Sequence, residues 1–156
     1  MATLSSAIVK AHVASMREVE EALARQVLYG GDLVTNLLEL ALVSEHLLTP
    51  LLAESFGLPP APHGELARAP DELMSLVPAE LAARHSFHPL EETAGILTIA
   101  VSEPLPAEVE GDLAFSLGVR IEQWAAPLVR IRQALARDYG VALDRRMLRL
   151  VAKLEG

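Results

Sequence analysis

Apolar and polar residues in the first third of the chain follow one pattern that occurs twice. When the chain is shifted against itself by 29 residues, seven apolar positions coincide. Five residues, 27–31, separate the two 24-residue copies. A fixed internal period of this kind indicates a duplicated structural unit. The matched positions are Leu4, Ile8, Val9, Val13, Ala14, Val19 and Leu23, which fall on Leu33, Leu37, Leu38, Leu42, Val43, Leu48 and Leu52.

Each copy is predicted to fold as two short helices joined by a turn. Its apolar residues recur at steps of three and four, which places them on one face of a helix. Ser15 followed by Glu18 is typical of a capping box at a helix start, and Ser44 takes the same place in the second copy. Gly30 and Gly57 are expected to end the helices that precede them. Because one hairpin cannot bury its apolar face alone, the two copies are expected to pack on each other.

The second half of the chain changes character after a proline-rich segment. Residues 58–64 hold three prolines and a glycine, so we place a linker at 58–70 between a helical part, 1–57, and an α/β part, 71–140. The pattern there predicts an αββαβα unit and, with the repeats, an α+β fold class. The predicted elements are helices at 71–75, 78–84, 106–117 and 127–140 and strands at 85–91, 96–101 and 119–124.

A last amphipathic helix is predicted at residues 144–154, within a C-terminal segment 141–156. We favour packing of its apolar side on the body of the chain, because soluble monomers rarely expose such a patch. The alternative is a docking helix for an acidic partner, with Arg145, Arg146 and Arg149 steering the association. The apolar side holds Met147, Leu150, Val151 and Leu154, and the opposite side holds Arg145, Arg146, Arg149 and Lys153.

Composition excludes several classes of function. The 156 residues are 51% hydrophobic, which suffices for a buried core, and contain no cysteine for a disulfide or a thiolate metal site. The net charge of −8 argues against nucleic acid and anionic lipid as partners. No apolar run approaches the roughly 20 residues of a membrane span, and the N-terminus lacks the pattern of a signal peptide. We therefore expect a cytoplasmic protein without direct membrane insertion.

The duplicated spacing, with an apolar pair four residues after Leu4 and a glutamine closing the first copy, resembles the MshEN-type domain. The similarity continues through residues 51–59, 76–85 and 97–105 and ends near 138–140. This domain precedes the motor core of bacterial type II secretion (protein E) and type IV pilus assembly ATPases. The resemblance implies a four-helix repeat part followed by a small α/β part, and a role in linking the motor to machinery components.

The resemblance also implies where a cyclic di-GMP ligand would bind. In family members that bind it, each repeat opens with arginine, leucine and glycine, has a second glycine seven residues after the first, and closes with glutamine. Losing the two arginines removes charge-assisted contacts of about 1.5–3 kcal/mol each, and Asp32 would oppose a phosphate. Cyclic di-GMP is therefore an unfavourable ligand, and we expect no cofactor. The arginine positions hold Thr3 and Asp32, the leucines are Leu4 and Leu33, the glycine positions hold Ser5, Val34, His12 and Ala41, and the closing positions hold Gln26 and Ser55.

Catalytic and metal-binding patterns are not visible in the sequence. No glycine-rich loop ends in Lys-Ser or Lys-Thr, so the nucleotide-binding motif of the motor core is absent. His85 and His88 are expected on opposite faces of one strand, and His12 and His46 singly on helices, so no metal site is predicted. We predict a non-enzymatic adaptor that binds a protein partner. The alternative is a cyclic di-GMP receptor regulating a motor, and the chain is either a stand-alone adaptor or part of a longer ATPase.

Overall fold

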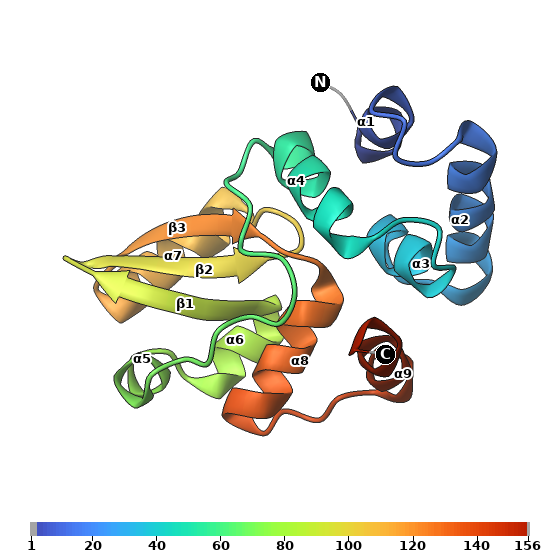
Figure 1. Cartoon of the computed structure of the whole chain (residues 1–156). Helices are drawn as coiled ribbons and strands as arrows, with labels where there is room; N and C mark the ends of the chain where they lie inside the picture. Colours follow the sequence, from blue (N-terminus) through green and yellow to red (C-terminus); the bar gives the residue numbers. More distant parts are fainter. Residues whose placement is uncertain (1–2, 156) are drawn as a thin grey trace.

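The computed structural model describes residues 3–155 and has an α+β fold, as predicted (Figure 1). Four helices come from the repeats, and the second half contains a small three-stranded sheet with helices around it. The elements are α1 (Leu4–Lys10), α2 (Met16–Tyr29), α3 (Leu33–Glu39), α4 (Glu45–Phe56), α5 (Asp71–Leu76), α6 (Ala79–His85), β1 (Phe87–Thr93), β2 (Ile96–Val101), α7 (Ala107–Leu117), β3 (Arg120–Ala125), α8 (Leu128–Tyr139) and α9 (Arg145–Glu155). None of the helices within residues 3–155 is both long and apolar enough to cross a membrane.

The two repeats pack on each other, which confirms the expectation from their apolar faces. Helix α1 of the first copy lies against α4 of the second, and α2 lies against α3. The side chains of Ile8, Leu37 and Leu48 are completely buried between these helices. The duplication therefore produces one shared core rather than two separate hairpins.

The predicted caps are confirmed for the first copy and differ in the second. The Ser15 hydroxyl accepts the Glu18 N–H at 3.1 Å, and the Glu18 carboxylate accepts the Ser15 N–H at 2.9 Å. Ser44 occupies the N-cap of α4, but its side chain makes no capping hydrogen bond. Gly57 ends α4 with a φ of 67°, a left-handed conformation that favours glycine.

The sheet has the order β1-β2-β3, with β1 antiparallel to β2 and β3 parallel to β2. Ala94 and Gly95 form the β1–β2 turn, with φ values of 54° and 79° that match the two-residue turns preferred in hairpins. Strand β1 begins at Phe87, two residues later than predicted, because Ser86 takes a left-handed φ of 53° and ends α6 after His85. His85 is therefore helical and does not share a strand with His88.

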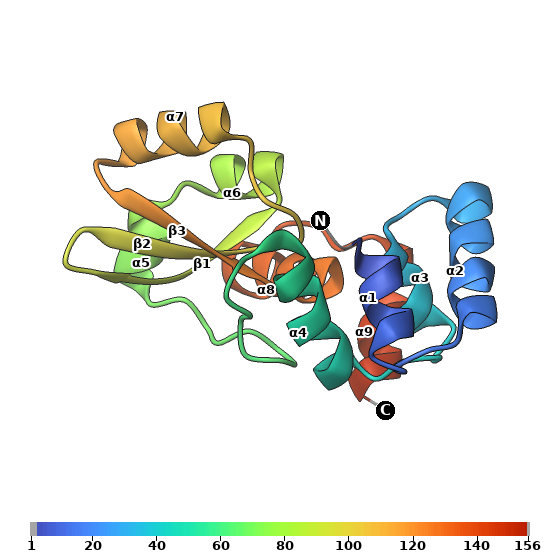
Figure 2. The same cartoon turned by 90° about the horizontal axis from the view of Figure 1, so that it is seen from above.

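Both faces of the sheet are covered. Helices α6 and α7 lie on one side, and the proline-rich segment 58–70 crosses the other (Figure 2). That segment is anchored to β3, since the Ala61 N–H donates to the Ala125 carbonyl at 2.8 Å. It also buries Ala61, Leu66 and Ala69 in the core of the second half. The strand between the two layers, β2, is correspondingly buried from residue 97 to 101.

Prolines precede the four helices α5 to α8 in the second half. Each has a φ near −60° that suits a helix, but a ψ near 150° that keeps it outside the first turn. The ring therefore occupies the N-cap, where no intrahelical N–H is needed. The four prolines are Pro70, Pro78, Pro106 and Pro127.

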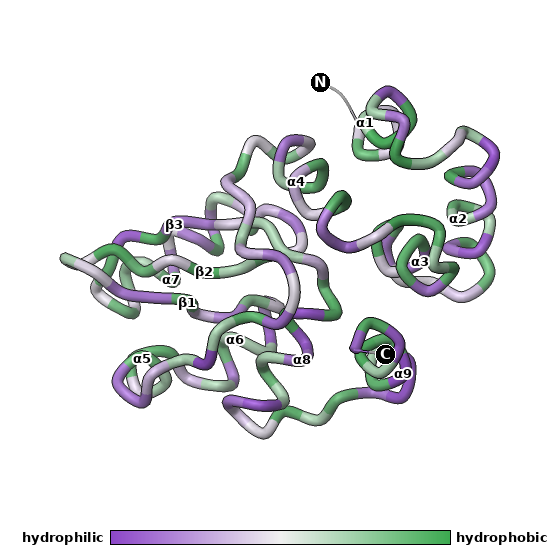
Figure 3. Tube along the Cα trace, viewed as in Figure 1, coloured by the Kyte–Doolittle hydropathy of each residue, from purple (hydrophilic) through white to green (hydrophobic). Residues whose placement is uncertain are grey.

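Helix α9 packs on the body of the chain, as its apolar stripe favoured. Met147 and Leu150 are buried, and Val151 and Leu154 are half-buried against the repeat core. The helix lies between α8 and α3, so the C-terminal helix packs on the N-terminal repeats (Figure 1). Hydrophilic and hydrophobic positions are both visible along it in Figure 3.

Arg130 joins three helices through a cluster of ion pairs with the nearly buried Glu45 and with Glu155, which is 55% exposed. The side chain of Arg130 is 6% exposed, and its guanidinium donates to the Glu45 carboxylate at 2.7 and 2.9 Å. It also donates to Glu155 at 3.1 Å and to Gln133 at 2.9 Å. Burial alone would lower the pKa of Arg130, but the hydrogen bonds that its guanidinium donates to Glu45 and Glu155 outweigh burial and raise the pKa. The cluster ties α4, α8 and the end of α9 together.

A second buried cluster lies between α8, β1 and the segment before α5. The Asp138 carboxylate accepts hydrogen bonds from His88 Nε2 at 2.8 Å, from Arg137 at 2.7 and 2.8 Å, and from the Ala69 N–H at 3.1 Å. Burial opposes ionisation of Asp138, but the bonds from Arg137, Ala69 and His88 lower its pKa to about 2. Burial also lowers the pKa of His88, so its neutral ring donates from Nε2. The side chains of both His88 and Asp138 are fully buried, which fits a structural role.

We predict that His88 makes stability depend on pH in mildly acidic solution. Its folded pKa lies below the ordinary 6.5, so below pH 6.5 the unfolded chain gains a proton that the folded chain does not. The contribution is complete above pH 6.5 and is lost as pH falls, by up to about 2 kcal/mol at pH 5. His88→Gln keeps an N–H donor for Asp138 but does not titrate. Urea unfolding from pH 7 to pH 5 should therefore show a smaller loss in this variant, and parallel pH profiles would contradict the assignment.

Candidate functional site

Leu4 of the first repeat and the opening residues 32–34 of the second line one cleft of about 650 Å³, which we call the repeat cleft. It lies between the starts of α1 and α3, the end of α4, and the facing ends of α6, β2 and α8. Leu4 and Leu33, which are 29 positions apart in the sequence, thus line the same cleft. The lining includes Leu4, Asp32, Leu33, Val34 and Phe56 on the repeat side and Arg84, His85, Ser102, Glu103 and Arg132 on the other.

The two positions where the family resemblance implies arginine are helix N-caps in this chain. The Thr3 hydroxyl accepts the Ser6 N–H at 3.2 Å at the start of α1. The Asp32 carboxylate accepts the Thr35 N–H at 2.7 Å at the start of α3. Both side chains are therefore bound to their own helices. Sequence reasoning missed this role, although Thr and Asp are preferred N-cap residues and the signal was present.

The two positions implied for the second glycine adopt a left-handed backbone conformation. His12 has a φ of 58° and follows the end of α1, and Ala41 has a φ of 56° and follows the end of α3. His12 was expected within a helix, so this corrects its placement. Neither residue lines the repeat cleft. In this chain both positions therefore have the left-handed geometry at a helix end that favours glycine.

The remaining ligand-motif positions do not converge on the repeat cleft. Gln26 is half-buried in α2, and the Ser55 hydroxyl donates to the Leu52 carbonyl at 2.7 Å within α4. Ser5 is half-buried in the first turn of α1. Of the ten motif positions, Leu4, Asp32, Leu33 and Val34 line the cleft. The motif positions that line the cleft are thus mostly apolar, and among them Asp32 carries the one negative charge.

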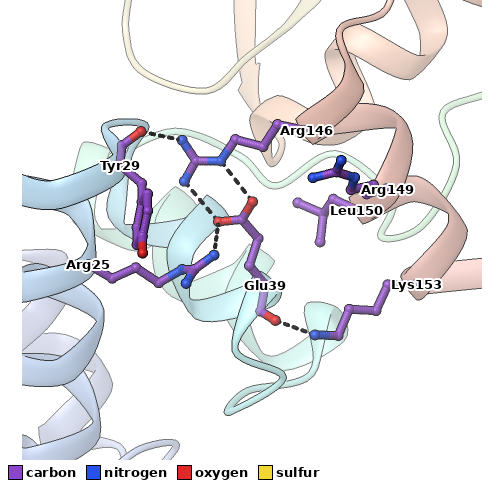
Figure 4. Close-up of a pocket in the computed structure, with 7 residues that line it drawn as sticks. All are labelled: Arg25, Tyr29, Glu39, Arg146, Arg149, Leu150 and Lys153. Atoms are coloured by element: carbon purple, nitrogen blue, oxygen red, sulfur yellow. Dashed lines mark hydrogen bonds and ion pairs between the residues drawn. The ribbon is translucent and has the colours of Figure 1, made fainter.

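A second cleft of about 560 Å³, which we call the α9 cleft, lies between α2, α3 and α9 (Figure 4). Glu39 is at its inner end, where its carboxylate accepts two hydrogen bonds from Arg146, at 2.7 and 2.8 Å. Arg25 approaches the same carboxylate at 3.5 Å. The hydrogen bonds from Arg146 outweigh burial and lower the pKa of Glu39, so it is ionised. The lining residues are Arg25, Tyr29, Glu39, Arg146, Arg149, Leu150 and Lys153.

Positive charge exceeds negative charge in the α9 cleft, where four cationic side chains face the single carboxylate of Glu39. The guanidinium of Arg25 lies 4.9 Å from the centre of the Tyr29 ring, in cation–π contact. Lys153 donates to the backbone carbonyl of Glu39, so its charge is not balanced by a carboxylate. Within residues 3–155, Arg149 has neither a hydrogen bond nor an ion pair, and it is exposed. The outer part of the cleft therefore attracts anions.

The three arginines predicted to contact a partner have different environments. Arg146 is used internally, since it also donates to the Tyr29 carbonyl at 2.9 Å and to Asn36 at 3.2 Å. Arg149 lines the α9 cleft, whereas Arg145 is exposed outside it. Arg25 was missed, because its presence in the cleft depends on packing between α2 and α9, and Lys153 was placed on the basic side of the last helix but not named as a partner contact. The spacing of 146, 149 and 153 on one helical face was the available signal for Lys153.

Metal chemistry has no cluster of ligands to support it in the part of the chain described here. Among residues 3–155, no three His, Asp or Glu side chains gather as a metal ion would require. The ring centres of His46 and His63 lie 6.0 Å apart, but no Asp or Glu among residues 3–155 joins them to make a set of three metal ligands.

Comparisons with known proteins agree with the fold described above. The profile of the MshEN domain matches residues 56–145. The type IV pilus assembly ATPases PilB of Myxococcus xanthus and Thermus thermophilus are each 29% identical over 87% of this chain, which spans 24% and 15% of their lengths. The structure of MshE with cdg covers 89% of this chain and 100% of its own, at 24% identity and a TM-score of 0.64. The N-terminal domain of XpsE covers 90% of this chain and 99% of its own, at 21% identity and a TM-score of 0.54.

The capping role of Asp32 predicts a loss of stability on truncation. Asp32→Ala should lower the free energy of unfolding by about 1 kcal/mol, because the Thr35 N–H loses its acceptor. Ser44→Ala is the matched control, since Ser44 is an N-cap without a side-chain capping bond and should change stability by less than about 0.5 kcal/mol. Urea unfolding of the two variants measures the difference, and equal losses would contradict the role of Asp32.

The left-handed conformation of Ala41 predicts a gain of stability with glycine. Ala41→Gly relieves a Cβ penalty of roughly 1–2 kcal/mol and adds an unfolded-state entropy cost of roughly 0.5–1 kcal/mol. The net gain should be about 0.5–1 kcal/mol. Ala11→Gly, at a right-handed φ of −82°, is the control and should lose stability by a similar amount. Thermal unfolding distinguishes them, and a loss in both variants would exclude strain at Ala41.

Proposed function

We propose that this chain, which belongs to the MshEN domain family, is a non-enzymatic module that binds a protein partner and does not bind cyclic di-GMP. Its relatives include type IV pilus assembly ATPases, so the machinery of a pilus or a secretion system in the cytoplasm is the setting we infer. The observation that carries the proposal is the use of Thr3 and Asp32 as helix caps at the positions where the family resemblance implies arginine.

Electrostatics at the repeat cleft supports the absence of cyclic di-GMP binding. A cyclic dinucleotide has two phosphates, and each arginine lost at a phosphate removes about 1.5–3 kcal/mol. The carboxylate of Asp32 lies in this cleft instead, and Glu103 adds a second negative charge. Together the two losses reduce affinity by roughly a hundredfold or more, before repulsion is counted.

The alternative is a receptor for cyclic di-GMP that regulates a motor. It is favoured by Arg84 and Arg132, which also line the repeat cleft and could contact phosphate. It is also favoured by the fold shared with MshE, which was solved with cdg (cyclic di-GMP). Against it, Arg84 already forms an ion pair with Glu80 on its own helix.

Exposed apolar side chains support a protein partner. On α2, Met16 is 62% exposed and Val27 is 86% exposed, with Leu23 between them on the same face at 40%. A helix face of this kind outside the core is typical of a contact surface. Adaptor function is compatible both with a stand-alone protein and with one part of a longer ATPase. This chain spans less than a quarter of the length of each of the two PilB relatives.

Isothermal titration with cyclic di-GMP tests the proposal. We expect no binding tighter than a dissociation constant of about 10 μM, which corresponds to roughly −7 kcal/mol. A variant combining Thr3→Arg, Ser5→Gly, Asp32→Arg and Val34→Gly is the comparison, because it introduces the opening arginine and first glycine that the family resemblance implies in each repeat. Tighter binding by the unmodified chain would overturn the proposal in favour of the receptor.

A further inference from the structure

We infer that the α9 cleft, together with Leu28 and Tyr29 beside it, is the docking surface for an acidic amphipathic segment of a protein partner. The inference rests on the proposed interaction function and deepens it by naming the surface and the chemistry of the partner. Its parts come from α2, α3 and α9, so the surface exists only when both ends of the chain are packed together (Figure 4).

The free positive charge lies at the outer part of the α9 cleft. Arg146 is saturated by Glu39, Asn36 and the Tyr29 carbonyl. Arg149 has no partner among residues 3–155, and Lys153 contacts only a backbone carbonyl there. In a chain whose net charge is −8, this is a local reversal of sign. Such a reversal steers an acidic partner toward one place and one orientation.

Glu39 argues against a small anion as the ligand of this cleft. Its side chain is only 13% exposed, less than those of Arg146 and Arg25, which hold its carboxylate. A phosphate or nucleotide entering the cleft would meet this fixed negative charge. Carboxylates distributed along a segment would instead reach Arg149 and Lys153 from outside and leave Glu39 undisturbed.

Apolar side chains beside the cations define the rest of the partner's chemistry. Leu28 and Tyr29 lie three and four residues after Arg25, hence on the same face of α2. They are 76% and 65% exposed. The contact with Arg25 holds the Tyr29 ring and leaves most of it accessible. Cations next to exposed apolar groups match a segment in which carboxylates alternate with leucine-like residues.

Peptide binding by the full chain provides the test. The probe is a fluorescein-labelled peptide of about 14 residues, roughly four helical turns, made of Glu with Leu at three- and four-residue steps. We expect saturable, salt-sensitive binding that falls at least about tenfold, or about 1.4 kcal/mol, in Arg149→Glu. Leu28→Ser should also weaken binding. The fold should persist in Arg149→Glu, with an unchanged thermal midpoint, because the exposed side chain of Arg149 has no hydrogen bond or ion pair to lose among residues 3–155.

The control variant is Arg120→Glu, which makes the same change of net charge at an exposed residue of β3 and should leave binding within about twofold. The inference is overturned if the peptide does not bind, if a Gln-for-Glu peptide binds equally well, or if both charge reversals weaken binding equally. It is also overturned if ATP or a single-stranded oligonucleotide binds through Arg149 and the peptide does not. Failure here leaves the cyclic di-GMP result unaffected, and a positive cyclic di-GMP titration would leave the peptide result unaffected.

Discussion

The arrangement of the two halves depends on the ion pairs that the buried guanidinium of Arg130 forms with Glu45 and Glu155. An arginine that is 6% exposed is costly to bury unless its charge is matched, and here the match comes from Glu45 at the start of α4 and Glu155 at the end of α9. These three helices must therefore be in place together. The same arrangement brings α9 beside α3 and so creates the α9 cleft. The repeat core and the C-terminal helix are for this reason parts of one structure.

The elements of the fold could be predicted from the sequence where interactions between residues close in sequence determine them. The repeat of apolar positions, the capping box of Ser15 and the glycine at residue 57 each act within a few residues, and the structure confirms them. The limits of the prediction appear where a backbone conformation is unusual for its residue. Ser86 is left-handed without being glycine, so α6 continues through His85 and β1 starts later than the alternation of residues indicated.

Contacts between distant residues could not be predicted in the same way. Glu39 and Arg146 are 107 residues apart, and His88 and Asp138 are 50 apart, so their pairing depends on tertiary packing rather than on local pattern. In the α9 cleft, the sequence indicated Arg146 and Arg149 as candidate partner contacts and placed Lys153 on the same side of the helix, but it did not indicate Arg25. The spacing of the basic residues predicted the basic face of α9. Helix α2 completes the cleft with Arg25 and Tyr29, but the sequence of α2 alone does not show that they face α9.

The substitutions at the ligand-motif positions fall into two groups with opposite effects on stability. Thr3 and Asp32 cap α1 and α3, which contributes about 1 kcal/mol at each helix start. His12 and Ala41 occupy left-handed positions at the ends of the same helices, at a cost of roughly 1–2 kcal/mol each. Each of these short helices thus gains at its first turn part of what it loses at its last. This compensation explains how the repeat fold persists in a chain whose opening positions do not carry the arginines of a ligand site.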